Sequence, residues 1–181
     1  MRLCRYGDPK LTDIPPTGSL VIRPAEAPDA QAIADIYNYY VANTTITFEE
    51  QAISSEVMAD RIEDVRSASL PWLVIEESGE ILGYAYASKW KTRSAYRFSV
   101  ESSVYLKNGT GGRGLGSRLY EALFVMLGSQ GIHAAIGGIA LPNEASISLH
   151  EKFQMKKVAH FEQVGFKFGQ WIDVGYWQKL L

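Results

Sequence analysis

The stretch Val100–Ser117 reads V-E-S-S-V-Y-L-K-N-G-T-G-G-R-G-L-G-S, and it decides how the rest of the chain is interpreted. It begins as a mostly apolar strand with one carboxylate, Glu101, and runs into a turn crowded with glycines. Residues 115–127 follow with apolar side chains at helical spacing. Glycines let backbone N–H groups converge with no Cβ in the way, and the first turn of a helix adds a positive dipole. The stretch therefore predicts a strand, a loop and a helix that together hold a phosphate group.

Length and composition indicate one globular domain. The chain has 181 residues, of which 46% are hydrophobic and 21% charged, which suits a single core. No apolar run approaches the roughly 20 residues that a membrane span needs. With a formal net charge of −2 and no clustered basic stripe, the chain lacks the electrostatic footprint of a nucleic-acid-binding protein. We expect neither a membrane nor a nucleic-acid partner.

The first 19 residues read as a flexible extension, and residues 20–181 as the single domain. The N-terminus lacks the continuous apolar region of a signal peptide, and one cysteine, Cys4, cannot form an intramolecular disulfide. Both features favour a cytoplasmic location. Cys4 has no histidine near it in sequence, so we expect an untethered thiol rather than a nucleophile.

Hydrophobic periodicity predicts a mixed fold of the α/β (α+β) class. Strands are expected at residues 20–23, 71–76, 81–90, 97–106, 133–141, 158–164 and 171–178. Helices are expected from residue 28, from 54 or 55 to about 66, at 115–127, and from Asn143 as N-cap to about 153. Antiparallel strands come first, and a strand, helix, strand unit that should be parallel and right-handed comes later.

Other phosphate-binding motifs fit the glycine loop poorly. Residues 109–114 formally match the dinucleotide fingerprint G-x-G-x-x-G, but that motif needs an acidic residue about 20 positions on, and residues 134–140 contain none. A Walker A loop needs Lys-Ser or Lys-Thr after the last glycine, which is absent. The overlapping frame G-R-G-L-G-S at residues 112–117 is the better candidate.

This frame resembles the acetyl-coenzyme A pyrophosphate loop of the GCN5-related N-acetyltransferases (GNAT). Three further blocks resemble the phosphinothricin and methionine sulfoximine N-acetyltransferases of that superfamily: W-K-T-R-S-A-Y-R-F-S-V-E-S-S-V-Y-L at 90–106, L-P-N-E-A-S-I-S-L-H-E-K at 141–152, and F-K-F-G-Q-W-I-D-V-G-Y-W-Q at 166–178. The similarity runs from about Val21 to the C-terminus. It implies a GNAT fold, with a mixed central sheet of about six to seven strands flanked by about four helices.

The resemblance also implies acetyl-coenzyme A as co-substrate and no metal. Residues expected to bind the cofactor are Val104, Tyr105, Leu106, Gly112, Arg113, Gly114, Leu115, Gly116, Ser117 and Asn143. The family usually carries Arg or Gln where this chain has Gly111, which puts coenzyme A affinity in question. His133 and His160 show no metal-ligand spacing with each other or with Cys4.

Acetyl transfer to an amine needs a base, because an α-amino group with a pKa of about 8 is mostly protonated at pH 7. Glu101 is the only carboxylate in residues 98–106, and burial in this strand would raise its pKa toward a useful value. The alternative is a solvent-facing charge. In the family this glutamate is the base. No Cys or Ser has a recognisable activating base in sequence, so we expect direct transfer in a ternary complex.

Five further side chains are candidates through the resemblance. Lys91, Arg93 and Tyr96 match substrate contacts, and Arg93 can hold a carboxylate or phosphinate in two places; a solvated loop is the alternative. Phe48 matches an aromatic that closes the substrate pocket, with a core position as the alternative. His150 stands where many GNAT enzymes have a Tyr that protonates the thiolate. An imidazole with a pKa near 6.5 can donate or relay that proton; a surface histidine is the alternative.

These inferences predict an N-acetyltransferase acting on the α-amino group of a small amino acid such as phosphinothricin, methionine sulfoximine or methionine sulfone. Acetylation of a peptide N-terminus or another amine is an alternative within the same fold. A non-catalytic coenzyme A sensor is a third reading, motivated by the unusual residues 109–111. The aromatic segment 166–178, which lies near a dimer interface in the family, predicts a homodimer.

Overall fold

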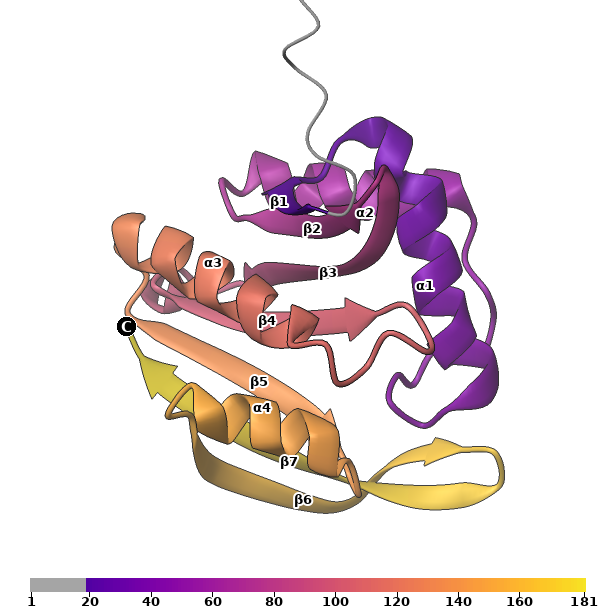
Figure 1. The fold of residues 1–181 in the computed structure, drawn as a ribbon. Helices are drawn as coiled ribbons and strands as arrows, with labels where there is room; N and C mark the ends of the chain where they lie inside the picture. The colour runs from indigo at the N-terminus through magenta and orange to yellow at the C-terminus, as the bar shows by residue number, and fades with distance from the viewer. Residues whose placement is uncertain (1–18) are drawn as a thin grey trace, which may run out of the picture.

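A single seven-stranded sheet organises the computed structural model, which describes residues 19–181. The strands are β1 (Leu20–Pro24), β2 (Trp72–Glu77), β3 (Glu80–Lys89), β4 (Ser99–Leu106), β5 (Ala134–Ala140), β6 (Lys156–Lys167) and β7 (Gln170–Leu180). Their order in the sheet is β1-β2-β3-β4-β5-β7-β6. Figure 1 shows the twisted sheet with its helices on both faces.

Four α-helices and two short 3-10 helices accompany the sheet. They are α1 (Ala30–Asn43), α2 (Ser55–Ser67), α3 (Leu115–Ser129), α4 (Glu144–Lys152), η1 (Ala27–Asp29) and η2 (Ser94–Tyr96). The apolar stripes of α1 and α2 form one core with one face of β2 and β3. The apolar stripe of α3 and side chains of α4 form a second core on the other face. The middle of the sheet is therefore covered on both sides, whereas the edge strand β6 is largely exposed.

The strands β4 and β5 are the only parallel neighbours in the described part of the chain. They pair over three residues, from Ser99↔Ala134 to Glu101↔Ile136, and then separate. Figure 1 shows the two strands diverging toward their carboxyl ends, with α3 as the connection between them. Backbone groups that would otherwise pair are left facing a gap in the middle of the sheet.

The structure confirms the predicted class, the parallel unit and the number of strands and helices. The last two strands are longer than expected, because the hairpin at Phe168-Gly169 continues ladder pairing outward on both sides. The predicted flexible extension, with Cys4, lies outside the described residues apart from Ser19.

Candidate active site

The glycine loop between β4 and α3 has the backbone that its sequence predicts. Gly112 and Gly114 have φ of +78° and +75°, a left-handed region that only glycine adopts without strain. Gly114 is the N-cap of α3, so the first helical N–H groups open toward the loop. A Cβ on Gly116 would lie 3.3 Å from Leu149 of α4, which explains a small residue there. The geometry fits a pyrophosphate held by backbone N–H groups.

A cleft of about 340 Å³ adjoins this loop. The end of β4, the loop and the start of α4 form its walls, and its lining residues are Tyr40, Ile46, Val104, Tyr105, Leu106, Lys107, Asn108, Gly109, Gly111, Gly116, Asn143, Ala145, Ser146 and Leu149. Five of the ten predicted cofactor residues are therefore in the lining. Asn143 also caps α4, because its Oδ1 accepts a hydrogen bond from Ser146 N at 3.1 Å.

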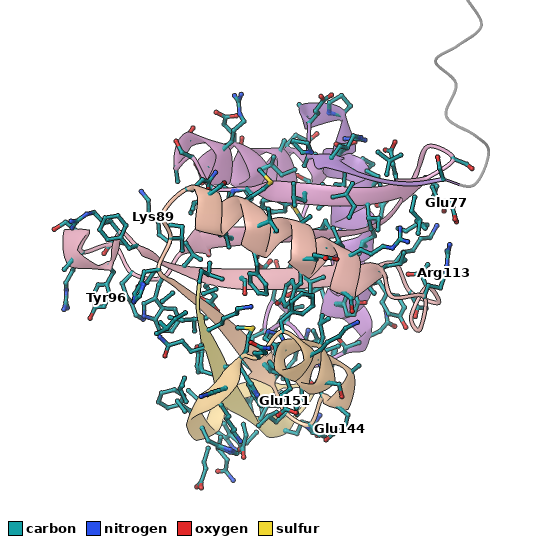
Figure 2. All side chains as sticks on the ribbon, turned by 60° about the vertical axis from the view of Figure 1, so that its left-hand side comes forward. Glu77, Lys89, Tyr96, Arg113, Glu144 and Glu151 are labelled. Atoms are coloured by element: carbon teal, nitrogen blue, oxygen red, sulfur yellow. The ribbon has the colours of Figure 1, made fainter. Side chains whose placement is uncertain are left out.

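The other predicted cofactor residues shape the loop from outside the cleft. Leu115 is buried in the core, so only its backbone can face a ligand. The side chain of Arg113 forms an exposed ion pair with Glu77 at 2.8 Å, and Figure 2 shows the two on the same side of the molecule. Ser117 accepts a hydrogen bond from Lys152 of α4 at 2.9 Å.

The backbone of β4 presents free donors to the gap beside β5. Trp90 N donates to Ser99 O, and Lys107 N donates to Leu82 O, at the two ends of the pairing between β3 and β4. Hydrogen bonding alternates along an antiparallel pair, so the N–H groups of Val104 and Leu106 point away from β3. Because β5 has already separated, these N–H groups face the gap. They are placed to hold a polarised carbonyl oxygen.

Glu101 lies on the face of the sheet that α1 and α2 cover. It shares this face with Tyr105, which packs against the core of those helices. Burial raises the pKa of the Glu101 carboxyl above its ordinary value, and the positive charge of Lys91 partly opposes that rise. A Cβ on Gly138 of β5 would lie 3.3 Å from Glu101 Oε1 and 3.2 Å from the ring of Tyr176. The carboxyl is therefore half-buried beside the aromatic ring of Tyr176, and its raised pKa suits proton transfer near neutral pH.

His150 lies on the opposite face, between α4, α3 and β5. It is 3% exposed, so the surface position considered from the sequence is wrong. His150 Nδ1 is 2.7 Å from Ser146 O, and Nε2 is 3.2 Å from the hydroxyl of Tyr120. A carbonyl oxygen only accepts, so in the neutral ring Nδ1 carries the proton and Nε2 accepts from Tyr120. Burial lowers the pKa of His150, and the hydrogen bond to Ser146 opposes the shift.

A small cavity of about 50 Å³ connects the two faces at the gap between β4 and β5. Tyr120 and His150 line it from one face, and Ser103 and Tyr105 line it from the other. Gly138 of β5 completes its wall. Tyr120 and His150 thus reach this opening directly, whereas Glu101 lies beside its Gly138 wall and is not one of the lining residues.

Comparison with known proteins identifies this arrangement. The model of the acetyltransferase (GNAT) domain family matches residues 22–175. The chain belongs to the GNAT acetyltransferase family. It is therefore an N-acetyltransferase, as the sequence predicted.

Individual relatives narrow the comparison. A phosphinothricin N-acetyltransferase of Streptomyces coelicolor is 37% identical over 182 residues, covering 93% of this chain and all (100%) of the relative. An L-methionine sulfoximine/L-methionine sulfone acetyltransferase of Salmonella typhimurium is 34% identical, covering 88% of this chain and 93% of the relative. The crystal structure of a GNAT superfamily phosphinothricin acetyltransferase from Sinorhizobium meliloti in complex with AcCoA matches with a TM-score of 0.87 at 34% identity, covering 90% of this chain and 88% of that one.

The residues predicted to bind the acceptor lie in two places in this acetyltransferase. Lys91, Arg93 and Tyr96 are exposed in the segment between β3 and β4, and Figure 2 shows Tyr96 on the opposite side of the molecule from Arg113 of the cofactor loop. Of these three residues, Lys91 carries the charge that partly opposes the rise in the pKa of Glu101. Phe48 is 41% exposed, so it is no core residue; the tip of its ring contacts Gly165 of β6. The structure brings Phe48 to the hairpin of β6 and β7.

Sequence reasoning missed several residues of the site. Tyr120 is fully buried, and nothing in its helical spacing distinguished it from a core residue. The rings of Tyr176 and Trp90 meet edge to face at 5.5 Å; both residues belong to blocks that resemble the family, but nothing in the sequence gives either of them a role. A polar hydroxyl within an otherwise apolar helix stripe was the one available signal for Tyr120.

The described part of the chain shows neither a metal-binding cluster nor a membrane-spanning helix. Residues 19–181 contain no cluster of three or more potential metal-ligating His, Cys, Asp or Glu side chains. None of the helices within this range is long and apolar enough to cross a membrane.

Proposed function

We propose that the chain transfers the acetyl group of acetyl-coenzyme A to the α-amino group of a small amino acid with a tetrahedral polar head. Phosphinothricin, methionine sulfoximine and methionine sulfone are the acceptors that the names of the relatives suggest. The observation that carries the proposal is Glu101. It is a carboxyl with a raised pKa beside an aromatic wall, next to the unpaired N–H groups of β4.

In the proposed reaction, Glu101 accepts a proton from the ammonium group of the acceptor. The free amine attacks the thioester carbonyl carbon, and a new C–N bond forms. The N–H groups of Val104 and Leu106 stabilise the negative charge that develops on the carbonyl oxygen. The C–S bond then breaks, the electron pair stays on the sulfur of coenzyme A, and the attacking nitrogen loses its extra proton to solvent to give the neutral amide.

The departing thiolate needs a proton, and His150 with Tyr120 is the proposed source. Nε2 of the neutral ring is an acceptor and holds no proton to give. Tyr120 O–H therefore gives its proton to the sulfur, and Nε2 takes up a proton from solvent and passes it to the Tyr120 oxygen. The lowered pKa of His150, caused by burial, keeps the ring neutral and ready to accept.

Lys91, Arg93 and Tyr96 are proposed to hold the anionic oxygens of the acceptor. Lys91 supports this role because it lies near enough to act on Glu101. Phe48 is proposed to cover the acceptor from the side of β6. Gly112, Arg113, Gly114, Leu115, Gly116 and Ser117 are proposed to bind pyrophosphate through their backbone, with Asn143 at the adjoining cleft.

One assay tests the proposal: release of free thiol from acetyl-coenzyme A across a panel of amino acids, aminoglycosides and peptides. We expect turnover with the phosphorus and sulfur analogues and little with peptides, which lack the free carboxylate next to the amine. Turnover restricted to peptides or other amines would refute the substrate class and leave the fold intact. Binding of acetyl-coenzyme A by calorimetry with no thiol release for any acceptor would support the sensor instead.

The proposed assembly is a homodimer. The hairpin of β6 and β7 leaves six large apolar side chains in solvent, and exposed apolar patches mark surfaces of association. They are Val158, Phe161, Val164, Phe166, Phe168 and Trp171, each at least 50% exposed. Light scattering at micromolar concentration tests this assembly, and a monomer would refute it. The cytoplasmic location inferred from the sequence stays a prediction.

A further inference from the structure

The edge strand β6 is irregular at one place. Its register against β7 shifts between Phe161 and Gly165, which leaves residues 162–164 without ladder partners. Within this bulge Gln163 has φ of +51°, a left-handed conformation that is costly for a residue with a Cβ. Interactions outside the ladder must therefore hold the bulge in shape.

Asp173 of β7 provides those interactions. Its Oδ1 accepts a hydrogen bond from Gln163 N at 2.8 Å, and its Oδ2 is 2.7 Å from His160 Nε2. The Lys157 ammonium, which can only donate, is 3.1 Å from His160 Nδ1. Nε2 of the neutral ring therefore carries the proton and donates it to Asp173. One carboxylate thus fixes the strained residue of the bulge and the residue that precedes Phe161.

The two ends of the bulge face the proposed acceptor site. On one side, the ring of Phe161 meets Tyr176 edge to face at 5.7 Å, and Tyr176 lies beside Glu101 across Gly138. On the other side, the ring of Phe48 packs on Gly165, where a Cβ added to Gly165 would lie 2.4 Å from the ring. The length and direction of the bulge therefore set the distance between two aromatic walls.

A second contact links the same strand to the segment that carries Phe48. Lys167 is 1% exposed and its ammonium donates to Thr47 O at 2.8 Å. The loop around Phe48 is therefore docked on the part of β6 that follows the bulge. Movement of the bulge moves both the seat of Phe48 and this anchor.

We propose that Asp173 is a positioning residue for the acceptor: by clamping the bulge at Gln163 it places Phe48 and Tyr176 around the substrate beside Glu101. Asp173 itself contacts no reacting atom. The inference rests on the proposed function, because it assigns the acceptor to the space that these aromatics enclose. It predicts that loss of the clamp affects the acceptor and spares acetyl-coenzyme A, whose cleft lies at the far end of β4.

The test compares Asp173→Ala and Asp173→Asn in steady-state assays. Asp173→Ala removes the carboxylate that accepts a hydrogen bond from Gln163 N. This change is expected to raise the KM for the amino-acid substrate about tenfold and to leave the KM for acetyl-coenzyme A unchanged. Asp173→Asn keeps an oxygen for Gln163 N and is expected to restore the acceptor KM to within about threefold of the unmodified protein. Glu121→Ala, which removes an exposed carboxylate from α3, is the matched control and is expected to change neither constant.

Hydrogen exchange gives a readout that does not depend on turnover. In Asp173→Ala, exchange should accelerate at Gln163 N–H and across residues 44–50, and Asp173→Asn should restore both. An unchanged acceptor KM, or an equal rise in both KM values, overturns the proposal. Faster exchange at Gln163 with unchanged residues 44–50 overturns it as well. If the unmodified protein turns over no acceptor, the proposed function fails, and the exchange of residues 44–50 still decides whether Asp173 positions the wall.

Discussion

Replacing Glu101 by Gln is the most direct test of the proposed chemistry. Glutamine keeps the volume and hydrogen-bonding shape of the side chain but cannot accept a proton from the acceptor ammonium. General-base catalysis contributes about 100- to 10,000-fold, which corresponds to about 3 to 5 kcal/mol of transition-state stabilisation. We expect a loss of that size in kcat/KM, with the dissociation constant for acetyl-coenzyme A unchanged, because its cleft does not include Glu101.

The pH dependence sharpens this prediction. Burial raises the pKa of Glu101 above its ordinary value of 4.5, so the rate should rise as the pH increases through that raised pKa. The Gln variant should lose this acidic limb, and its residual rate should follow deprotonation of the acceptor amine. The folded state favours the neutral carboxyl, so the stabilising effect is present below pH 4.5 and is lost as the pH rises through the raised pKa. Glu101→Gln should therefore melt higher than the unmodified protein at pH 7.

Two results would refute the reasoning. Full activity of Glu101→Gln at pH 7 would show that another group, or solvent, takes the proton. A large loss accompanied by weaker acetyl-coenzyme A binding would show that Glu101 supports the cofactor cleft instead. Glu121→Gln, which makes the same chemical change on the exposed face of α3, is the matched control and should leave rate, profile and melting temperature unchanged.

Three further changes test the cofactor loop and the His150 face. Gly111→Gln should tighten acetyl-coenzyme A binding in calorimetry, because Gly111 lines the cleft and a Cβ added to it meets nothing within 4 Å. Gly109→Gln is the control: Gly109 has a φ of +84°, and this change should not tighten binding. Gly137→Ala should lower the melting temperature by the equivalent of about 1–3 kcal/mol and reduce kcat, because the new Cβ would lie 2.2 Å from His150 Nε2. Gly138→Ala should have a milder effect, because the atom nearest to its new Cβ is 3.2 Å away. Because burial lowers the pKa of His150, the free energy of unfolding should fall as the pH drops below about 6.5 in urea titrations, and His150→Asn should flatten that dependence.

The sequence predicted the fold well because its signals were local. Glycine spacing after β4, the N-cap Asn143 and the apolar stripe of α3 each act through neighbouring residues, and the structure has all three in the predicted places. Strands β6 and β7 were predicted too short, because backbone pairing between them continues beyond the apolar residues from which they were predicted.

The contacts within the candidate site were harder to predict from the sequence, because they join residues that are far apart along the chain. The hydrogen bond of Tyr120 to His150 spans 30 positions, and the docking of Phe48 on Gly165 spans more than a hundred. The residues next to either member of such a pair in the sequence give no indication of which residue it will contact. The family resemblance supplied His150 and Phe48, but the partners that orient them appear only when the strands are placed side by side.

The two glycines of β5 make room for the proposed base, Glu101, and for the proposed proton relay through His150. Side chains of a strand alternate between faces, so adjacent residues 137 and 138 face opposite sides of the sheet. Gly137 leaves room for His150 on the face of α3 and α4, and Gly138 leaves room for Glu101 and Tyr176 on the other. A Cβ at position 137 would lie 2.2 Å from His150 Nε2 and displace the ring, whereas at position 138 Tyr176 and Glu101, at 3.2 and 3.3 Å, would have to shift by only a few tenths of an ångström. The two glycines of β5 thus make room for the proposed base on one face of the sheet and for the proposed proton relay on the other.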